Sequence, residues 1–330
     1  MIGLVAAFAV IYLVWGSTYL AIRFAVETIP PFLLAGARFL VAGGIMYAWL
    51  LARGEAKVTK GQLVPCATSG ILMLVGGNGL VCWAEQFIPS GITALIIGTA
   101  PLWIVMVGWI GFKDDVPSGK IVLGLLLGLV GIGILAEPAG FSAGEINLWG
   151  IVAILFACFF WAWGSFLSKS PKMPKSTLLS VALQMLIAGA AMLLISCGLG
   201  EPINMDWSAV SAKSLWSLAY LIVFGAILAY SCYGWLFRNA SAVAVSTYAY
   251  VNPVVAVILG YWLANEEVTQ MTIIGAALIL FSILLVSGAR RNWLNVAASG
   301  SLNDTYRSQP LLSLLIMPNT LIRGISAAIF

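Results

Sequence analysis

The sequence predicts an all-α membrane protein of ten transmembrane helices, arranged as two inverted five-helix repeats. Three observations lead to this fold class. Of the 330 residues, 62% are hydrophobic and only 8% are charged, whereas a soluble domain carries about 25% charged residues. The apolar residues gather in runs long enough to cross a bilayer. The same features also recur, in the same order, in the two halves of the chain.

Charges, prolines and glycine clusters divide the chain into ten apolar runs. A helix needs about 20 apolar residues to cross the hydrocarbon core, and it satisfies its own backbone hydrogen bonds in lipid. The runs do not alternate between apolar and polar residues, as the strands of a membrane β-barrel do. The first run has no cleavage site, so we expect an uncleaved first span. The predicted helices cover residues 3–22, 31–51, 64–84, 91–112, 119–136, 148–168, 177–199, 215–236, 242–263 and 270–288.

Lysine and arginine predict the orientation of these helices. With the amino terminus in the cytoplasm, the outer segments hold Arg23 and Lys213, and Arg38 lies within a span. We therefore expect a multi-pass protein of the cell inner (plasma) membrane with both termini cytoplasmic. The basic residues on the inner side are Arg53, Lys57, Lys60, Lys113, Lys120, Lys169, Lys172, Lys175, Arg238, Arg290, Arg291, Arg307 and Arg323.

The internal repeat is clearest around two prolines. When Pro101 is aligned with Pro253, 152 positions later, the acidic pair at 114–115 aligns with the acidic pair at 266–267. An apolar run follows each pair. A kinked apolar helix, an acidic pair and one more apolar helix therefore occur twice.

Two further matches extend the repeat to the whole body of the chain. A Gly-Ser pair occurs at 16–17 and at 164–165, and residues 38–43 resemble residues 184–189. Each copy contains five spans, an odd number, so the copies must face opposite ways across the membrane. Inverted repeats of this kind are typical of secondary transporters, whose site lies near the midplane between the repeats.

The repeat predicts the domain boundaries. Residues 1–138 form the first five-helix repeat, 139–147 a linker, and 148–291 the second five-helix repeat. Residues 292–330 form a C-terminal tail whose apolar part is too short to span a membrane, and we assign it no role.

Several functional classes find no support in the composition. The chain has no histidine, and its five cysteines fall inside apolar runs without metal-ligand spacing. The basic residues form no clustered face for nucleic acid. No two spans offer facing aspartates, and no span has a Ser/His pair, so an intramembrane hydrolase is disfavoured. We therefore expect no metal, no cofactor, no catalytic residue and no nucleic-acid partner; the chain is not expected to be an enzyme.

Pro101 and Pro253 fall near the centres of the fourth and ninth runs. A proline inside a helix removes one backbone hydrogen bond and kinks the helix. Each kink either shapes helix packing alone or belongs to the binding site or its hinge. The symmetry of the two positions favours the second alternative.

Polar and aromatic side chains within the spans are the candidates for a binding site, because polar groups in a membrane are costly and usually face the bundle interior. Deep aromatic rings would hold an apolar or cationic group by packing or cation–π contact. For any single residue, helix packing is the competing explanation. The candidates for substrate binding are Trp15, Ser17, Asn78, Thr99, Trp163, Tyr230, Tyr248 and Asn252.

Arg38 is the one charge well inside a span, and an unpaired arginine there costs at least about 2.5 kcal/mol. Glu85, near the outer end of the third run, is the best candidate for its partner. Two hypotheses follow: a structural Arg38–Glu85 ion pair, or an arginine that binds carboxylates in the outer vestibule. We favour the ion pair because Arg38 lies nearer the outer end of its span than the centre.

Several motifs carry a family resemblance. The first span contains Trp-Gly-Ser-Thr-Tyr at 15–19, and the second begins with Pro-Pro-Phe at 30–32 and continues to Ala-Arg-Phe at 37–39. Ala-Pro at 100–101 and Asn-Pro at 252–253 precede the acidic pairs. With ten spans in two halves, the chain resembles the EamA-type drug/metabolite transporter superfamily over about residues 3–290.

This resemblance implies a bacterial inner-membrane exporter of small metabolites, most commonly amino acids, that works by alternating access. It implies a central cavity lined by spans one, three, four, six, eight and nine. The expected partners are a small-molecule substrate and the lipid bilayer, and the chain is expected as a monomer or weak homodimer. A multidrug or cationic-compound exporter and, less favoured, a channel remain as alternatives, and coupling to protons stays open. The resemblance carries the cavity role to Trp15, Asn78, Thr99, Trp163, Tyr230, Tyr248 and Asn252.

Overall fold

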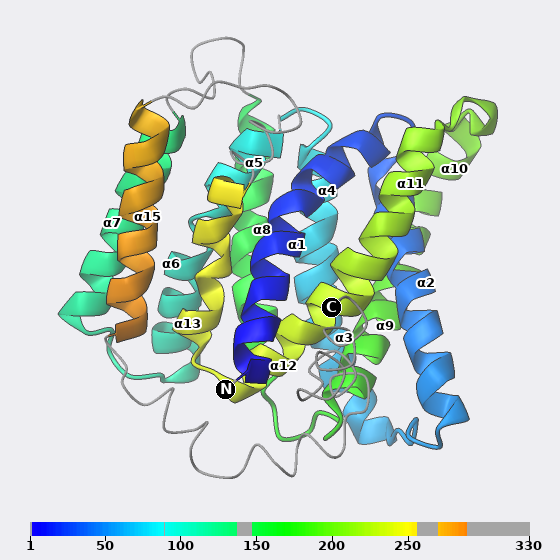
Figure 1. Ribbon diagram of the computed structural model, residues 1–330. Helices are drawn as coiled ribbons and strands as arrows, with labels where there is room; N and C mark the ends of the chain where they lie inside the picture. The colour runs from blue at the N-terminus through cyan, green and yellow to red at the C-terminus, as the bar shows by residue number, and fades with distance from the viewer. Residues whose placement is uncertain (1, 89, 137–146, 256–269, 289–330) are drawn as a thin grey trace, which may run out of the picture.

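The computed structural model describes residues 2–88, 90–136, 147–255 and 270–288. Across these residues the chain is helical, with no β-strand (Figure 1). The all-α prediction is therefore confirmed for the described part. Residues 139–146 of the predicted linker, the acidic pair at 266–267 and the C-terminal tail lie outside it.

Six of the predicted spans are continuous α-helices over the described residues. A proline occupies the first turn of the second span, where its missing N–H is not needed. The side chains of Asn147 and Ser176 accept hydrogen bonds from backbone N–H groups at the starts of the sixth and seventh spans. The continuous helices are α1 (Ile2–Val26), α2 (Pro31–Ala52), α7 (Gly119–Ala136), α8 (Leu148–Leu167), α9 (Thr177–Gly198) and α15 (Gln270–Gly288).

The other four spans are interrupted, which the apolar runs did not predict. The third and eighth spans each contain a π-helical stretch, a rare form that is frequent at functional sites. The third span consists of α3 (Lys60–Gly70), η1 (Ile71–Gly79) and α4 (Leu80–Ala84), and the eighth of α11 (Ala212–Tyr220), η4 (Leu221–Tyr230) and α12 (Ser231–Asn239).

The fourth and ninth spans contain turns. The fourth consists of α5 (Ser90–Ile97), α6 (Ala100–Met106) and the π-helical η2 (Val107–Gly111). The ninth begins with α13 (Ala242–Ser246), turns at Thr247 and is helical again over 248–255. Short helices α10 (Glu201–Asn204) and η3 (Trp207–Ala209) connect α9 to α11.

In the described part of the chain, seven helices are long and apolar enough to cross a membrane, when consecutive helical segments are counted as one, and three more apolar helices are shorter. The shorter ones are Gly119–Gly131, Ala242–Val255 and Ile273–Ile283. Each of the ten predicted runs is mainly helical in its described part, with turns in the fourth and ninth.

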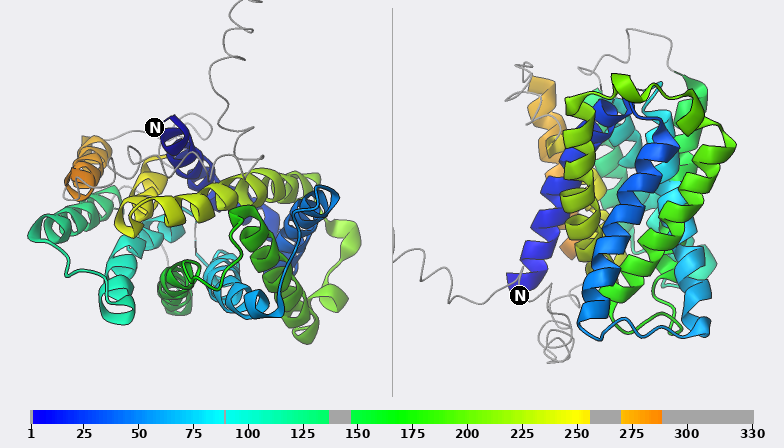
Figure 2. Two further views of the ribbon diagram at one scale, coloured as in Figure 1. Left: turned by 90° about the horizontal axis from the view of Figure 1, so that it is seen from below. Right: turned by 90° about the vertical axis from the view of Figure 1, so that its right-hand side faces the viewer.

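Two helix pairs lie at opposite ends of the bundle: α7 packs beside α15, and α2 beside α9 (Figures 1 and 2). Glycines bring α2 and α9 close together. A methyl group on Gly43 would lie 2.8 Å from the backbone nitrogen of Leu186, and one on Gly189 would lie 2.5 Å from the backbone nitrogen of Leu40. Gly43 and Gly189 lie 146 positions apart, and so do Leu40 and Leu186. The two close contacts are therefore equivalent in the two halves of the chain.

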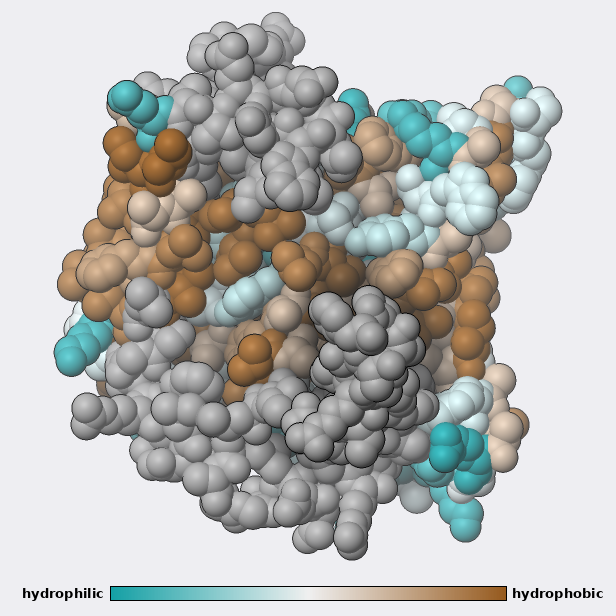
Figure 3. All heavy atoms as spheres, viewed as in Figure 1, coloured by the Kyte–Doolittle hydropathy of each residue, from teal (hydrophilic) through white to brown (hydrophobic). Residues whose placement is uncertain are grey.

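The outer surface suits lipid. Apolar side chains form a band across the face in Figure 3, between hydrophilic residues at the two ends of the molecule. Large apolar side chains of the described chain are strongly exposed, among them Leu194 at 74% and Ile110 at 69%. Apolar side chains so exposed to water would be unfavourable, so the band belongs in a bilayer.

Candidate functional site

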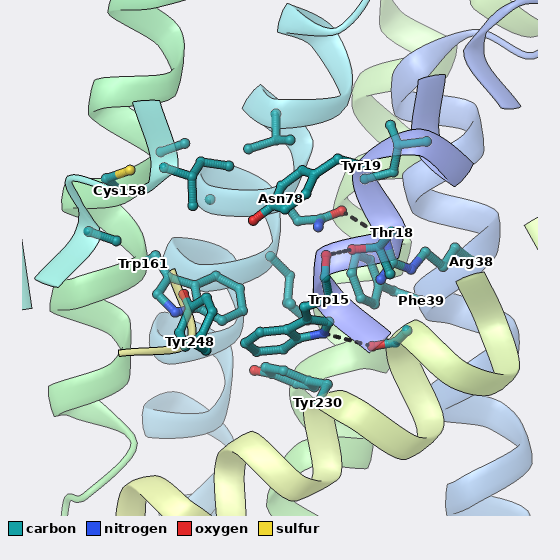
Figure 4. A pocket seen from close by; sticks show the side chains of 18 residues that line it. Trp15, Thr18, Tyr19, Arg38, Phe39, Asn78, Cys158, Trp161, Tyr230 and Tyr248 are labelled. Atoms are coloured by element: carbon teal, nitrogen blue, oxygen red, sulfur yellow. Dashed lines mark hydrogen bonds between the residues drawn. The ribbon is translucent and has the colours of Figure 1, made fainter. Parts of the chain in front are cut away.

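A cavity of about 70 Å³ lies in the middle of the bundle. On the same volume scale, one water molecule needs about 10–15 Å³. It is surrounded by spans one, two, three, four, six, eight and nine (Figure 4). Its lining residues are Trp15, Thr18, Tyr19, Ile22, Arg38, Phe39, Leu74, Gly77, Asn78, Val81, Ile97, Ala100, Ala157, Cys158, Trp161, Gly225, Tyr230 and Tyr248.

One face of α1 supplies a wall of this cavity. Trp15, Thr18, Tyr19 and Ile22 follow the spacing of residues that share one helix face. The indole N–H of Trp15 donates to the carbonyl oxygen of Gly225 at 3.3 Å, which ties α1 to the π-helical η4. This hydrogen bond fixes the ring against the cavity.

An aromatic cluster closes one end of the cavity. Its members are Trp15, Trp161, Tyr230, Tyr233 and Tyr248, whose rings meet edge-on or tilted. The ring centroids of Trp15 and Tyr248 lie 4.8 Å apart, and those of Trp15 and Trp161 lie 5.5 Å apart. In Figure 4 the Trp15 ring lies beside Tyr230 and Tyr248. Such aromatic pairs contribute about 0.5–1.5 kcal/mol each beyond their buried area.

A second, smaller cavity of about 10 Å³ lies beyond this aromatic cluster. Tyr230 lines both cavities, and Tyr233 lines the second, together with Gln184 and Arg238. The aromatic cluster therefore separates the two cavities. The hydroxyl of Tyr230 donates to the amide oxygen of Gln184 at 2.7 Å on the side of the second cavity.

Arg38 is 3% exposed and lines the first cavity. Its Nη1 donates to Oδ1 of Asn78 at 3.4 Å, a long hydrogen bond, and its Nε has no hydrogen-bond partner among the described residues. The guanidinium carbon lies 4.7 Å from the centre of the Phe39 ring. In Figure 4 Arg38 comes from the same side of the cavity as Thr18 and Phe39.

Glu85 does not pair with Arg38. Its side chain is fully buried, and neither carboxylate oxygen has a hydrogen-bond partner among the described residues. Arg23 reaches Glu85 only through the backbone, where Nη1 donates to the Glu85 carbonyl oxygen. The ion pairs in the described part of the chain are Arg53–Glu55 and Lys213–Glu27. The structure thus departs from the favoured ion-pair hypothesis.

Four of the eight predicted substrate-binding residues line the cavity: Trp15, Asn78, Tyr230 and Tyr248. Asn252 lies one step behind it, because its Nδ2 donates at 3.1 Å to the hydroxyl of Tyr19, which does line it. The π-helical stretches η1 and η4 carry Asn78 and Tyr230 to this place.

The other three predicted residues do not line the cavity. The Ser17 hydroxyl bonds the hydroxyl of Tyr220 at 2.6 Å, between α1 and α11. Thr99 stands at the turn before α6. Trp163 packs its ring 5.5 Å from that of Phe112. None of the three is among the lining residues.

The two prolines lie close to helix breaks. Pro101 is in the first turn of α6, directly after the turn at residues 98–99. The fourth span is therefore broken before the proline, where no backbone N–H is lost. Pro253 lies within the helical residues 248–255, six positions after the turn at Thr247. Both side chains are buried.

Trp161 and Tyr19 are lining residues outside the predicted set. A signal for Tyr19 was the helical spacing, since it lies four residues after the predicted Trp15. Trp163, only two residues after Trp161, faces nearly the opposite side of α8. Among the described residues, no three cysteine, aspartate or glutamate side chains come together as a metal site would require.

Comparison with known proteins decides the family. The EamA-like transporter family matches residues 1–136 and, separately, residues 148–288. The chain belongs to the EamA-like transporter family. It is a multi-pass transporter of the inner membrane.

Two relatives are similar in sequence over most of the chain. An Escherichia coli K12 protein named "Uncharacterized inner membrane transporter YedA" is 36% identical over 289 residues, covering 87% of this chain and 91% of the relative. A Salmonella typhimurium protein named "Probable amino-acid metabolite efflux pump" is 25% identical over 281 residues, covering 83% of this chain and 91% of the relative.

A solved crystal structure has a similar fold. It matches with a TM-score of 0.71 at 21% sequence identity, covering 88% of this chain and 98% of its own. At this identity the likeness concerns the fold alone.

Proposed function

We propose that this EamA-family chain is a secondary transporter that exports small metabolites, amino acids foremost, by alternating access between two inverted repeats. The observation that carries the proposal is the cavity between the two halves, closed at one end by the aromatic cluster. Trp15 enters this cluster from the first half, and Trp161, Tyr230, Tyr233 and Tyr248 enter it from the second. A site between the repeats is what rocking of two halves requires.

The bounds of the helices support two repeats of one unit. α2 and α9 both have 22 residues and start 146 positions apart, and α3 and α11 start 152 positions apart. The third and eighth spans change to π-helix at similar places, 150 positions apart. The reciprocal glycine contacts of α2 and α9 fit a pseudo-two-fold axis between these helices. The two separate family matches agree with the same division.

The predicted orientation of the helices indicates which side of the membrane the cavity faces. The cavity is lined by the second half of α1 and the first half of α2, which the positive-inside rule assigns to the outer side. The aromatic cluster then lies between the cavity and the cytoplasm. This conformation corresponds to a state that faces outward or is occluded, and the second cavity marks where the inner path would open.

Amino acids are the favoured cargo because one relative is named as an amino-acid metabolite efflux pump. The cavity also combines aromatic walls with the polar groups of Arg38 and Asn78, which suits a molecule with both charged and apolar parts. Two halves that rock about a central site make a carrier, whereas a channel conducts through one open path.

Counterflow in proteoliposomes tests the proposal. The purified protein is reconstituted with one unlabelled amino acid inside, and a labelled trace of the same compound is added outside, for each amino acid in turn. We expect saturable, transient accumulation of the label for at least one compound. Non-saturating uptake would indicate a channel, and no accumulation for the whole panel would contradict amino-acid transport. Empty liposomes and a Trp161→Ala variant serve as controls.

A further inference from the structure

Arg38 has hydrogen-bonding capacity that the protein leaves unused. A guanidinium group has five N–H donors, and among the described residues the structure shows one long hydrogen bond from it, to Asn78. Nε is buried and unpartnered. A buried donor without an acceptor costs about 1–3 kcal/mol, and more when the group is charged. The group is therefore incomplete without an acceptor in the cavity.

The equivalent position in the second half shows what a satisfied group looks like. Gln184 stands 146 positions after Arg38, at the same place in α9 as Arg38 in α2. Both ends of its side-chain amide are hydrogen-bonded: Nε2 donates to the Ser69 hydroxyl at 3.0 Å, and Oε1 accepts from the Tyr230 hydroxyl at 2.7 Å. Arg238, beside the second cavity, likewise donates to Pro174, Lys175, Thr177 and Ser180. Of these three residues, Arg38 is the one with a buried side-chain nitrogen that has no hydrogen-bond partner in the described structure.

The charge of Arg38 is also unbalanced. The described lining of the cavity contains no aspartate or glutamate, and Arg38 takes part in neither of the described ion pairs. One positive charge in an apolar surrounding attracts one negative charge strongly, because water screens it little there. The Nδ2 group of Asn78, with no hydrogen bond among the described residues, adds a neutral donor beside it.

We infer that Arg38 and Asn78 bind the carboxylate of the transported molecule, and that the cargo is a small compound with one carboxylate and an apolar body. The inference rests on the proposed transport function and names the charge class of its substrate. A guanidinium edge matches a carboxylate in a bidentate geometry. The apolar body then packs against Trp15, Trp161 and Tyr248 at the end of the cavity where the aromatic cluster lies.

The same geometry disfavours other cargo. An organic cation without a carboxylate would meet the charge of Arg38 with no acid to offset it, in spite of the aromatic rings. A phosphate dianion would leave one negative charge unmatched, because Arg38 is the one charged residue of the described lining. An ammonium group on the same molecule is compatible, since ring faces attract cations.

Mass spectrometry of the culture medium tests the inference without prior choice of a ligand. Cells expressing the protein, Arg38→Gln, or the control Arg53→Gln are compared with cells lacking it. Arg53 forms an exposed ion pair with Glu55 away from the cavity, so its change matches the chemistry of Arg38→Gln. We expect the compounds that accumulate with the protein to carry a carboxylate. We expect Arg38→Gln to lower their accumulation about tenfold or more, as the loss of a charged hydrogen bond predicts, and Arg53→Gln to leave it unchanged.

A second variant separates binding from folding. Asn78→Asp keeps Arg38 in place but puts a carboxylate beside it, so it should lower the accumulation as Arg38→Gln does, while the purified variant elutes and melts as a folded protein. If both variants fail to fold, the chemical class of the accumulated compounds decides. Accumulated compounds without a carboxylate, or unchanged accumulation with both folded variants, would overturn the role of Arg38 and leave the transport function standing. No compound accumulating with the unaltered protein would overturn export and this inference together.

Discussion

Trp161 and Trp163 show how finely helix geometry divides roles between neighbouring residues. Both are aromatic, both lie in α8, and two positions separate them. Trp161 lines the cavity and its indole N–H donates to the hydroxyl of Tyr233 at 3.0 Å. Trp163 instead packs against Phe112 and Phe159, away from the cavity.

Alanine substitution of these two tryptophans should therefore give different results. Trp161→Ala removes a ring of the aromatic cluster and the partner of Tyr233, so we expect transport to fall about tenfold or more, by analogy with aromatic anchors in other sites. Trp163→Ala removes packing alone, so we expect a lower melting temperature with transport per folded molecule preserved. Counterflow in proteoliposomes measures both variants side by side. Equal loss of transport in the two variants would contradict the assignment.

Glu85 offers a test of what a buried carboxyl group contributes. Burying a charge is costly unless it is paired and hydrogen-bonded, and neither side-chain oxygen of Glu85 has a partner among the described residues. Glu85→Gln keeps the shape and removes the charge, so we expect the melting temperature to stay the same or rise. A thermal melt in detergent measures this. A drop of several degrees would mean that the carboxylate has a stabilising contact with a group such as Arg23.

Of the eight candidate binding residues chosen by residue type and depth, four line the cavity. Trp15, Asn78, Tyr230 and Tyr248 line the cavity, while Ser17 and Trp163 do not. The reason is that α1 and α8 are apolar on all sides, so the sequence does not show which face turns inward. Arg38 could be located, but its lack of an acidic partner depends on where the Glu85 side chain lies in three dimensions.

At the scale of helices, the contact between α2 and α9 depends on glycine. Gly43 has no room for a methyl group, because such a group would lie 2.8 Å from Leu186 and 3.0 Å from Ala182, whereas nothing lies within 4 Å of a methyl group on the adjacent Gly44. The two glycines differ in surroundings and share the same helix, so they make a matched pair.

Alanine at these two positions should have opposite effects on stability. Gly43→Ala forces α2 and α9 apart, so we expect it to lower the stability by about 1–3 kcal/mol. Gly44→Ala adds a better helix former in open space, so we expect a gain of about 0.5–1 kcal/mol. Thermal melts of both purified variants measure the difference. A loss at Gly44 as large as at Gly43 would show that the close approach is not the cause.

The positions of the helices could be predicted well, and their internal form could not. Run length and hydropathy placed the spans because lipid demands a certain apolar length. The π-helical stretches at 71–79 and 221–230 could not be predicted from run length and hydropathy, because neither quantity depends on whether the helix is α or π. The first of these stretches packs closely against α8, because a methyl group added at Gly77 would lie 3.0 Å from the Trp161 ring.

At the scale of the whole molecule, the inverted repeat makes a prediction about sidedness. Lys57 and Lys172 lie in loops that should both be cytoplasmic, and Ala209 lies in a loop that should be outside. All three are exposed, which makes them accessible to a reagent. Cys197 is exposed and is first replaced by serine, while the other four cysteines are buried.

Single cysteines at these positions test the arrangement in intact cells. We expect a membrane-impermeant maleimide to label Ala209→Cys and to leave Lys57→Cys and Lys172→Cys unlabelled until the cells are lysed. Labelling after lysis confirms that each cysteine is accessible. Residues 57 and 172 on opposite sides of the membrane would contradict the inverted repeat and the carrier mechanism that depends on it.

The unequal pair of Arg38 and Gln184 has a consequence for the speed of transport. A cationic residue near one mouth and a neutral one near the other give cargo a different dwell time on each side of the bilayer. For transport without a coupled ion, the concentration gradient of the cargo alone determines its final distribution, because a carrier that is unchanged by transport cannot alter the equilibrium between two solutions. Replacing Gln184 by arginine would therefore make the two rates of release more equal without changing the final distribution of the cargo. A single substitution after duplication would be enough to make release faster on one side of the membrane than on the other.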